Sequence, residues 1–585
     1  MRLFLLLILT LSGARLLAAE SALKTEAELS GFVRTGRYAE VERLCAAFAE
    51  RYPDAVRCLT FGLSPEGRPM HVLVATRSGV FEPDQAKRQG IPVLLFQGGI
   101  HAGEIDGKDA GFLALAELLE QDAGALDRIV FLFVPVFNVD GHERFKAWNR
   151  PNQRGPAEGG WRTTAQNLNL NRDYTKAAAP EMQAMLALLN AWDPIVLADL
   201  HVTDGAKFEH DVAILVEPHH SGSAAMREAG TQLRDRLIAE LKRQGSLPLP
   251  FYPSFNQEDD PTSGITDGVA TPRFSHAYWA TRNRFGVLVE THSWKDYRTR
   301  VRITRNTILA LCQLGSGAGR NWRALAEAAD REAAKLGGKT VAVAYAANEH
   351  SREVDFRGYA YTRTPSAISG GLVTRYDESR PELWKMPLRD QVEASEFARL
   401  PEFAYAIPAA EAGWLAAKLR LHGIDFYPTE RPLTVTAAGV FRAEALRFAP
   451  APFEGRSLLQ LDGRWAEEEA SLAPGSLIVP SAGNNGRLLA ALLDPQAPDS
   501  FAAWGFFNAA FEAKEYMEAY VAEDIASAML AADPALARAF SERLDQDKEF
   551  AASKQARLDF FYRRHSAWDD HRDRYPVLRL DRPLP

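Results

Sequence analysis

Four near-continuous apolar runs place the strongest constraint on how this chain can fold. Such runs are typical of strands that are buried on both faces of a sheet. Helical patterns at 106–121, 180–192 and 223–243 lie between them. Strands that alternate with helices predict an α/β architecture of packed layers. The apolar runs are 92–97, 129–137, 194–200 and 285–290.

A change of pattern near 314–319 indicates a second structural unit. That stretch is rich in Gly and Ser, which is typical of a connection between domains. Strand-like sequence with Gly and Pro turns follows it and predicts a mixed α+β region, to which we assign no chemistry. We expect a signal segment at 1–19, a first domain at 20–319 and an accessory region of unknown role at 320–585. The other expected elements are strands at 56–60 and 70–75 and helices at 38–52, 321–336, 409–421 and 501–557.

Length and composition restrict the class of protein. A chain of 585 residues is too long for one hydrophobic core and predicts two to four domains. With 46% hydrophobic and 25% charged residues it is typical of a globular protein, which excludes a disordered or collagen-like chain. The net charge of −8 and the lack of a Lys/Arg run in the sequence give no electrostatic basis for binding nucleic acid or anionic membrane.

The first nineteen residues have the pattern of a secretory signal. Arg2 supplies the charge, 3–11 the apolar stretch, and Ala18 and Ala19 the small residues before a cleavage site. The apolar stretch is shorter than the roughly 20 residues that span a bilayer. We expect a cleaved signal and a secreted or periplasmic protein, with an uncleaved anchor as the alternative.

Three cysteines are too few for a disulfide framework or a cysteine-rich zinc module. A bridge between Cys45 and Cys58 is one interpretation. We favour the other, in which these two residues and Cys312 are small buried thiols.

The segment Gly98-Gly99-Ile100-His101-Ala102-Gly103-Glu104 has the clearest chemical pattern. It follows an apolar run and precedes a helical one, where ligand sites gather in α/β sheets. An imidazole and a carboxylate three residues apart can bind one cation from the same side. Zn²⁺ uses these donors, and a catalytic zinc keeps three protein ligands and one open position. His201, which follows the run 194–200, is the candidate third ligand.

Two further sets of polar residues lie in similar places. Glu290 ends the run 285–290, and burying a carboxylate there is unfavourable unless it has a partner or a function. A raised pKa in that setting suits a general base. Asn171 and Arg172 place an amide beside a guanidinium, which together can bind a carboxylate. For each of these groups the alternative is a purely structural role.

Taken in order, these motifs make the chain resemble the zinc carboxypeptidases of the carboxypeptidase A type. The resemblance covers roughly 20–319 and implies a mixed eight-stranded sheet between helices. It implies one Zn²⁺ per chain. It also implies that Asn171 and Arg172 hold the terminal carboxylate of the substrate, and that Glu290 is the general base. The zinc ligands implied by the resemblance are His101, Glu104 and His201.

The resemblance also implies an arginine that polarises the scissile carbonyl. The spacing to Asn171 in one branch of the family gives Arg162, which we prefer, and the spacing in another gives Arg154. Where the family has an Asp that orients the first zinc His, this chain has Asn169, an uncharged acceptor. Tyr278 lies in the interval of the family's mobile tyrosine without a motif match. The residue that sets side-chain preference falls within 271–280, where Arg273 and His276 are the candidates.

Three functions remain open. The first is an exported zinc carboxypeptidase that acts on a peptide with a free carboxylate. The second is a zinc deacylase for N-acyl amino acids or cell-wall peptides, and the third is a peptide-binding module without activity. The oligomeric state cannot be predicted. Among the other histidines, His142 follows a turn and is expected to pack or cap, and His292, two residues after Glu290, is at most a neighbour of the site. Three lack partners at ligand spacing: His210, His219 and His220.

Overall fold

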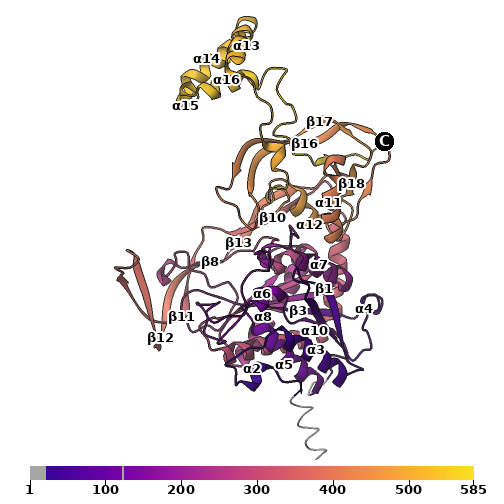
Figure 1. Ribbon diagram of the computed structural model, residues 1–585, viewed down its shortest axis with the longest axis vertical. Helices are drawn as coiled ribbons and strands as arrows, with labels where there is room; N and C mark the ends of the chain where they lie inside the picture. Colours follow the sequence, from indigo (N-terminus) through magenta and orange to yellow (C-terminus); the bar gives the residue numbers. More distant parts are fainter. Residues whose placement is uncertain (1–21, 121–123, 585) are drawn as a thin grey trace, which may run out of the picture.

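The computed structural model describes residues 22–120 and 124–584 (Figure 1), so the expected signal segment lies outside the described residues. Within these ranges no helix combines the length and the apolar character that crossing a bilayer requires. The chain forms an N-terminal region around one large sheet and a C-terminal region of smaller sheets and helices.

An eight-stranded mixed sheet is the centre of the N-terminal region, with the strand order β1-β2-β4-β3-β5-β9-β6-β7. The middle strands β4, β3, β5 and β9 are parallel, and β2 and β6 flank them antiparallel. The predicted mixed eight-stranded sheet is therefore confirmed. The strands are β1 (Val56–Leu63), β2 (Pro69–Ala75), β3 (Val93–Gly98), β4 (Val130–Val134), β5 (Val196–Val202), β6 (Val212–Glu217), β7 (Pro248–Leu249) and β9 (Phe285–Thr291).

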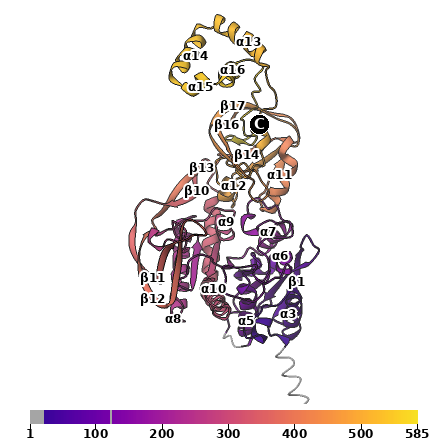
Figure 2. The same ribbon diagram turned by 60° about the vertical axis from the view of Figure 1, so that its left-hand side comes forward.

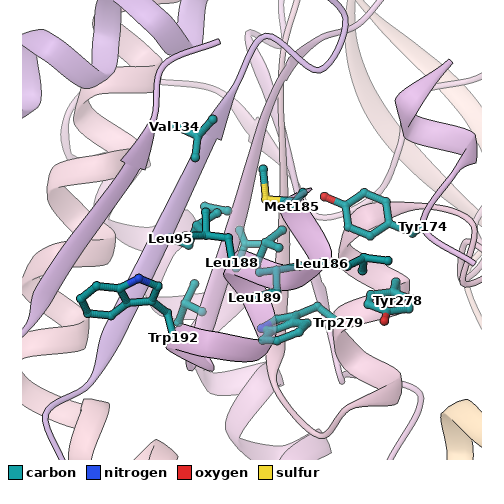
Figure 3. Packing of buried hydrophobic residues seen from close by; sticks show 14 of the residues in the cluster. Leu95, Val134, Tyr174, Met185, Leu186, Leu188, Leu189, Trp192, Tyr278 and Trp279 are labelled. Atoms are coloured by element: carbon teal, nitrogen blue, oxygen red, sulfur yellow. The ribbon is translucent and has the colours of Figure 1, made fainter. Parts of the chain in front are cut away.

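Helices cover both faces of this sheet (Figure 2), which explains why its middle strands are apolar throughout. Neighbouring residues of a strand point to opposite faces. Leu94 of β3 lies against α10, whereas Leu95 lies among side chains of α7, including Leu188 and Leu189 (Figure 3). The helices of this region are α2 (Glu26–Leu29), α3 (Tyr38–Arg51), α4 (Pro83–Gln89), α5 (Asp106–Glu120), α6 (Val139–Glu143), α7 (Pro180–Trp192), α8 (Ala224–Arg243), α9 (Ser275–Thr281) and α10 (Tyr297–Ala333).

The Gly/Ser-rich stretch 314–319 is not a connection, and this expectation was wrong. It lies inside α10, which continues unbroken to Ala333 and includes most of the helix expected at 321–336. A Cβ on Gly315 would come within 2.7 Å of Leu94, and one on Gly319 within 2.7 Å of Pro92. The glycines therefore let the helix approach the sheet closely. The division of the chain into domains at residue 319 stays a prediction, and α10 crosses it.

The C-terminal region is mixed α+β, as predicted. Its largest sheet has the order β15-β18-β14-β19-β16-β17, and a hairpin of β11 and β12 projects to one side (Figure 1). The hairpin is joined to the N-terminal region, because β12 pairs with β8 (Ile265–Thr266). The strands are β10 (Thr340–Ala347), β11 (Arg352–Pro365), β12 (Leu372–Arg389), β13 (Val392–Arg399), β14 (Ala404–Ile407), β15 (Tyr427–Pro428), β16 (Leu433–Phe448), β17 (Leu459–Leu472), β18 (Leu477–Pro480) and β19 (Leu578–Leu580).

The helix expected at 409–421 is confirmed as α11, whereas the one expected at 501–557 is divided into shorter elements. The helical pattern at 501–557 corresponds to turns up to η3 (Asn508–Phe511), followed by four short helices that form a cluster of their own at the end of the molecule (Figure 1). Asp533, Asp547 and Ser553 cap three of these helices and so divide the pattern. The helices are α11 (Ala409–Leu421), α12 (Gly486–Leu493), α13 (Ala519–Ala532), α14 (Pro534–Gln546), α15 (Lys548–Ala552) and α16 (Lys554–Tyr562).

Cys45 and Cys58 form a disulfide that links α3 to β1, so the preferred interpretation as separate thiols was wrong. The sequence could not decide between the two, because the pairing depends on α3 packing across the start of β1. Cys312 is a buried free thiol.

Candidate metal centre and active site

Three parallel strands bring the candidate site residues to one edge of the sheet. His101 and Glu104 lie in the loop between β3 and α5, and His201 lies near the end of β5. Glu290 lies on β9, directly opposite His201 in the pairing of the two strands. Because β3, β5 and β9 are neighbours in that order, their carboxyl ends form one continuous edge.

The two imidazoles and one carboxylate face one another. Nδ1 of His101 lies 3.1 Å from Oε1 of Glu104, and Nδ1 of His201 lies 3.0 Å from Oε2 of the same carboxylate. One donor atom from each residue lies within 4.8 Å of the others. The three side chains are only 2–3% exposed, and Nδ1 of His101 is buried and makes no hydrogen bond to any residue that the structure describes. A donor set of two histidines and one glutamate with an orphaned nitrogen fits a zinc ion.

Each histidine is held from behind through its other nitrogen. Nε2 of His101 lies 3.0 Å from Oδ1 of Asn169, and Nε2 of His201 lies 2.8 Å from Oδ2 of Asp199. Asp199 also accepts hydrogen bonds from Gln97 and Ser275. Such outer contacts fix the orientation of a ring that can bind a metal, and here they leave each Nδ1 facing the Glu104 carboxylate. Asn169 thus occupies the place that the sequence indicated, with an amide oxygen as the acceptor.

For each of the three clustered residues, burial and the neighbouring polar or charged groups shift the pKa in opposite directions. Burial lowers the pKa of His101 to about 4, which keeps the ring neutral. Burial also opposes ionisation of Glu104, but hydrogen bonds from His101 and His201 and the charge of Arg150 outweigh it and hold the pKa of Glu104 well below its usual range. For His201, the Asp199 carboxylate outweighs burial and raises the pKa.

Two arginines face Glu104. Nη1 of Arg162 lies 3.0 Å from Oε1 of Glu104, and Nη1 of Arg150 lies at the same distance. Arg154 does not reach the site, because its guanidinium pairs with Glu378 of β12 at 2.8 Å. The structure therefore distinguishes the two arginines that the sequence left open, with Arg162 beside the candidate ligands.

Sequence reasoning missed Arg150. The only trace of Arg150 in the motif is Gly103, because a Cβ at that position would lie 2.5 Å from Cγ of Arg150. The glycine in the motif is thus required by the packing of an arginine stem. That arginine lies far along the chain, so the motif alone could not reveal it.

Glu290 is a buried carboxylate with an unusual charge balance. Burial, together with Glu104 and Asp199, raises the pKa of Glu290 to about 8, although His201 opposes the rise. Its Oε2 atom is buried and makes no hydrogen bond within the described part of the chain. A carboxyl group that can be neutral or ionised near neutral pH, with a free oxygen, can accept and return a proton.

Asn171 and Arg172 lie in a short turn, η1 (Leu170–Arg172), at the wall of the same cavity. The Arg172 guanidinium stacks on the ring of Phe274 at 4.2 Å and donates to the Asn171 carbonyl at 2.7 Å. Oδ1 of Asn171 is buried and makes no hydrogen bond to a described residue. The turn therefore presents a guanidinium in a fixed orientation and a side-chain amide to a ligand in the cavity.

A cavity of about 350 Å³ joins these groups. It includes His276, whereas Arg273 is drawn away by an ion pair with Asp499 at 2.5 Å. Tyr278 is buried elsewhere against His422, and His292 stacks on Phe208. Sequence reasoning missed several residues that line the cavity, for which no local pattern gives a signal: Val202, Asp204, Leu215, Tyr252, Gly268, Ala270, Phe274 and Leu288.

The fold and the donor set define a class: an α/β protein with a metal-type cluster at the carboxyl edge of its sheet. A family model described as zinc carboxypeptidase matches residues 41–207, which confirms the resemblance for that part of the chain. The match includes the metal-type cluster, Arg162, Asn171 and Arg172, and ends before Glu290.

Known proteins that resemble this chain include carboxypeptidase D of Mus musculus and of Homo sapiens. They are 26% and 25% identical over 179 residues. Each alignment covers 28% of this chain and 12% of the relative, so the chain matches only a small part of these proteins.

Solved structures that resemble the chain include carboxypeptidase A from Helicoverpa armigera, with 17% identity, a TM-score of 0.34, and coverage of 54% of this chain and 81% of that one. Another is bovine thrombin-activatable fibrinolysis inhibitor in complex with tick carboxypeptidase inhibitor. Its identity is 15%, its TM-score 0.36, and its coverage 49% of this chain and 98% of that one.

Proposed function

We propose that this chain is an exported zinc metallocarboxypeptidase that hydrolyses the C-terminal peptide bond of its substrate. The observation that carries the proposal is the buried cluster of His101, Glu104 and His201, whose donor atoms lie within 4.8 Å of one another. These three residues would hold one Zn²⁺. When bound, zinc lowers the pKa of a water molecule toward neutrality and polarises a carbonyl group. The similarity to carboxypeptidase D supports the same reaction class.

Glu290 is the general base in this proposal. It lies opposite His201 on the neighbouring strand, and its raised pKa matches a group that exchanges protons near neutral pH. It takes the proton of the attacking water and delivers it to the nitrogen of the leaving amine. The scissile C–N bond then breaks with a neutral amine as the leaving group.

Arg162 stabilises the negative charge that develops on the carbonyl oxygen. Its Nη1 atom is 3.0 Å from Glu104, so a guanidinium is already in place beside the metal-type cluster. Preorganised positive charge at such a point is typically the largest electrostatic contribution to catalysis.

Asn171 and Arg172 bind the free carboxylate of the substrate. The stacking on Phe274 holds the guanidinium plane, and the amide of Asn171 offers a second set of hydrogen bonds. Fixing this carboxylate sets the distance to the bond that is cleaved. The substrate class is therefore a peptide, or a peptide-like amide, with a free terminal carboxylate.

Export is part of the proposal and has two supports. The pattern of 1–19 is that of a secretory signal. The Cys45–Cys58 disulfide is the kind of bond that persists in an oxidising compartment outside the cytosol. A secreted or periplasmic location agrees with both.

Mass spectrometry of a peptide library incubated with the purified chain tests the proposal. We expect removal of single residues from free C-termini, loss of that activity after chelation, and recovery with zinc. Hydrolysis of N-acyl amino acids alone would establish a deacylase instead. Retention of peptides without cleavage by the zinc-loaded chain would establish a binding module.

A further inference from the structure

The loop between β16 and β17 in the C-terminal region reaches the turn that carries Asn171 and Arg172. The loop closes tightly, with Phe453 and Arg456 paired through both backbone hydrogen bonds. Its two central residues, Glu454 and Gly455, both have positive φ, at 51° and 74°. Such two-residue turns favour Asn-Gly or Asp-Gly. Glu is not favoured at this position of the turn. We therefore expect a contact of its side chain to account for its presence there.

The Glu454 carboxylate is aimed at the N-terminal region. Its Oε2 atom accepts the backbone N–H of Asn169 at 2.8 Å. Gly455 lies beside Leu168, the residue that precedes Asn169 in the chain. Both central residues of the loop therefore contact the segment Leu168–Asn169. Within the described residues the Glu454 carboxylate is bound to the backbone of Asn169, whereas the Arg172 guanidinium donates to the carbonyl of Asn171.

Asn169 connects two parts of the site. Its Oδ1 atom accepts the backbone N–H of Asn171 at 3.0 Å, and it also lies 3.0 Å from Nε2 of His101. A residue that fixes the backbone of Asn169 therefore acts on a candidate metal ligand and on the carboxylate-binding turn together. Charge-assisted hydrogen bonds to a backbone N–H are among the stronger ones in proteins.

A second contact from the C-terminal region supports the other side of the turn. Asp499 pairs with Arg273, whose neighbour Phe274 lies beneath the Arg172 guanidinium. Trp504 donates from its indole N–H to Thr175 at 3.0 Å. None of the described residues that line the cavity comes from the C-terminal region. That region therefore supports the residues of the cavity wall without contacting the cavity itself.

We propose that Glu454 is a positioning residue of the site and that the C-terminal region completes the carboxylate-binding turn through it. Glu454 acts through Asn169 on His101 and on Asn171–Arg172. This inference rests on the proposed function for its catalytic meaning. Its effect on metal retention does not depend on which reaction the site performs.

The test uses the full-length chain with Glu454→Ala, Glu454→Gln and a control, Glu467→Ala, whose side chain is exposed on β17. We expect Glu454→Ala to raise KM for a peptide with a free C-terminus about tenfold, the effect of losing one charge-assisted hydrogen bond. The change in kcat should be smaller. Zinc retention against a chelator should weaken several-fold. Glu454→Gln keeps an oxygen acceptor and should restore most of both properties.

Several results would overturn the proposal. One is unchanged KM and zinc retention in Glu454→Ala, and another is equal impairment of the Gln and Ala variants. Equal loss in Glu467→Ala would show a general effect of the hairpin and would also overturn it. If the wild-type chain cleaves no peptide, the proposed function fails, and zinc retention in the Glu454 variants still decides whether this residue positions the site.

Discussion

Arg300 in the N-terminal region and Arg464 in the C-terminal region each pair with a carboxylate at 2.9 Å, but their surroundings differ. Arg300 and its partner Asp106 are almost completely buried, whereas the side chains of Arg464 and Glu444 are 78% and 60% exposed. Arg300 also donates to several backbone carbonyls, and Asp106 accepts from Thr291, the neighbour of Glu290.

The difference shows how burial changes what an ion pair does for the structure around it. A buried charge must have all its hydrogen bonds satisfied, so the pair around Asp106 fixes the end of β9 in one arrangement. Exposed pairs such as Arg464–Glu444 are screened by water and fix little. The buried pair therefore helps to preorganise the strand that carries Glu290, whereas the exposed pair restrains its own strands little.

The largest expected effect separates a buried carboxylate from an exposed one. Glu290→Gln should reduce kcat by about 10²–10⁴-fold, because the amide cannot accept the proton. Zinc content, measured by atomic spectroscopy, should stay at the wild-type level. Glu444→Gln on β16 is the matched control and should leave kcat unchanged. Turnover close to that of the wild type would remove Glu290 from the role of base.

The second prediction compares the two ion pairs directly. Arg300→Ala leaves Asp106 buried without its partner and should lower the free energy of unfolding by about 3–5 kcal/mol. Arg464→Ala should lower it by about 0.5 kcal/mol or less. Urea unfolding of both variants measures the contrast. Similar losses in the two would show that burial does not distinguish these pairs.

The third prediction concerns the arginines of the site. Arg172→Ala should lower kcat/KM for peptides with a free C-terminus by about 10–100-fold, the value of a hydrogen bond to a charged group. C-terminally amidated peptides should be affected much less. Arg154→Ala, which loses only the contact with Glu378, is the control and should leave this selectivity intact. Equal losses for both kinds of substrate would contradict carboxylate recognition by Arg172.

The smallest expected effect is at the contact between the two regions. Arg154 and Lys207 hold the pKa of Glu378 at about 2, below its ordinary 4.5. The folded state therefore gains stability from this carboxylate above pH 4.5, and the gain is lost as the pH falls through about 2. Because the groups are partly exposed, Glu378→Gln should reduce stability at pH 7 by only about 0.2–1 kcal/mol. The difference from the wild type, followed by urea unfolding, should disappear toward pH 2. A difference that persists there would rule out titration of Glu378 as its cause.

Local pattern was enough to predict the centre of the fold and most of the candidate site. The apolar runs that became β3, β5 and β9 lead to His101, His201 and Glu290, and parallel strands bring such ends to one edge. The order of these residues along the chain then indicated the resemblance to zinc carboxypeptidases, which the family model supports for residues 41–207. Both inferences depend on short stretches whose structure is set by their own sequence.

What could not be predicted depends on contacts between distant segments. Gly315 lies in a stretch whose composition is typical of a linker. Only the position of Leu94 shows that this glycine allows the helix to pack closely against the sheet. Arg150 and Glu454 likewise lie far along the chain from Glu104 and Asn169, which they contact. No local pattern carries such pairings, because they are fixed by the packing of whole regions.

The path of α10 has a practical consequence for making shorter versions of this protein. Beyond Gly319, the helix carries Trp322, whose ring packs against Phe285 at the start of β9, and Asp330, which pairs with Arg284 at 3.0 Å. A truncated gene ending at codon 319 would strip these supports from the strand that bears Glu290. Any attempt to produce the first region alone should therefore retain the helix to Ala333 at least.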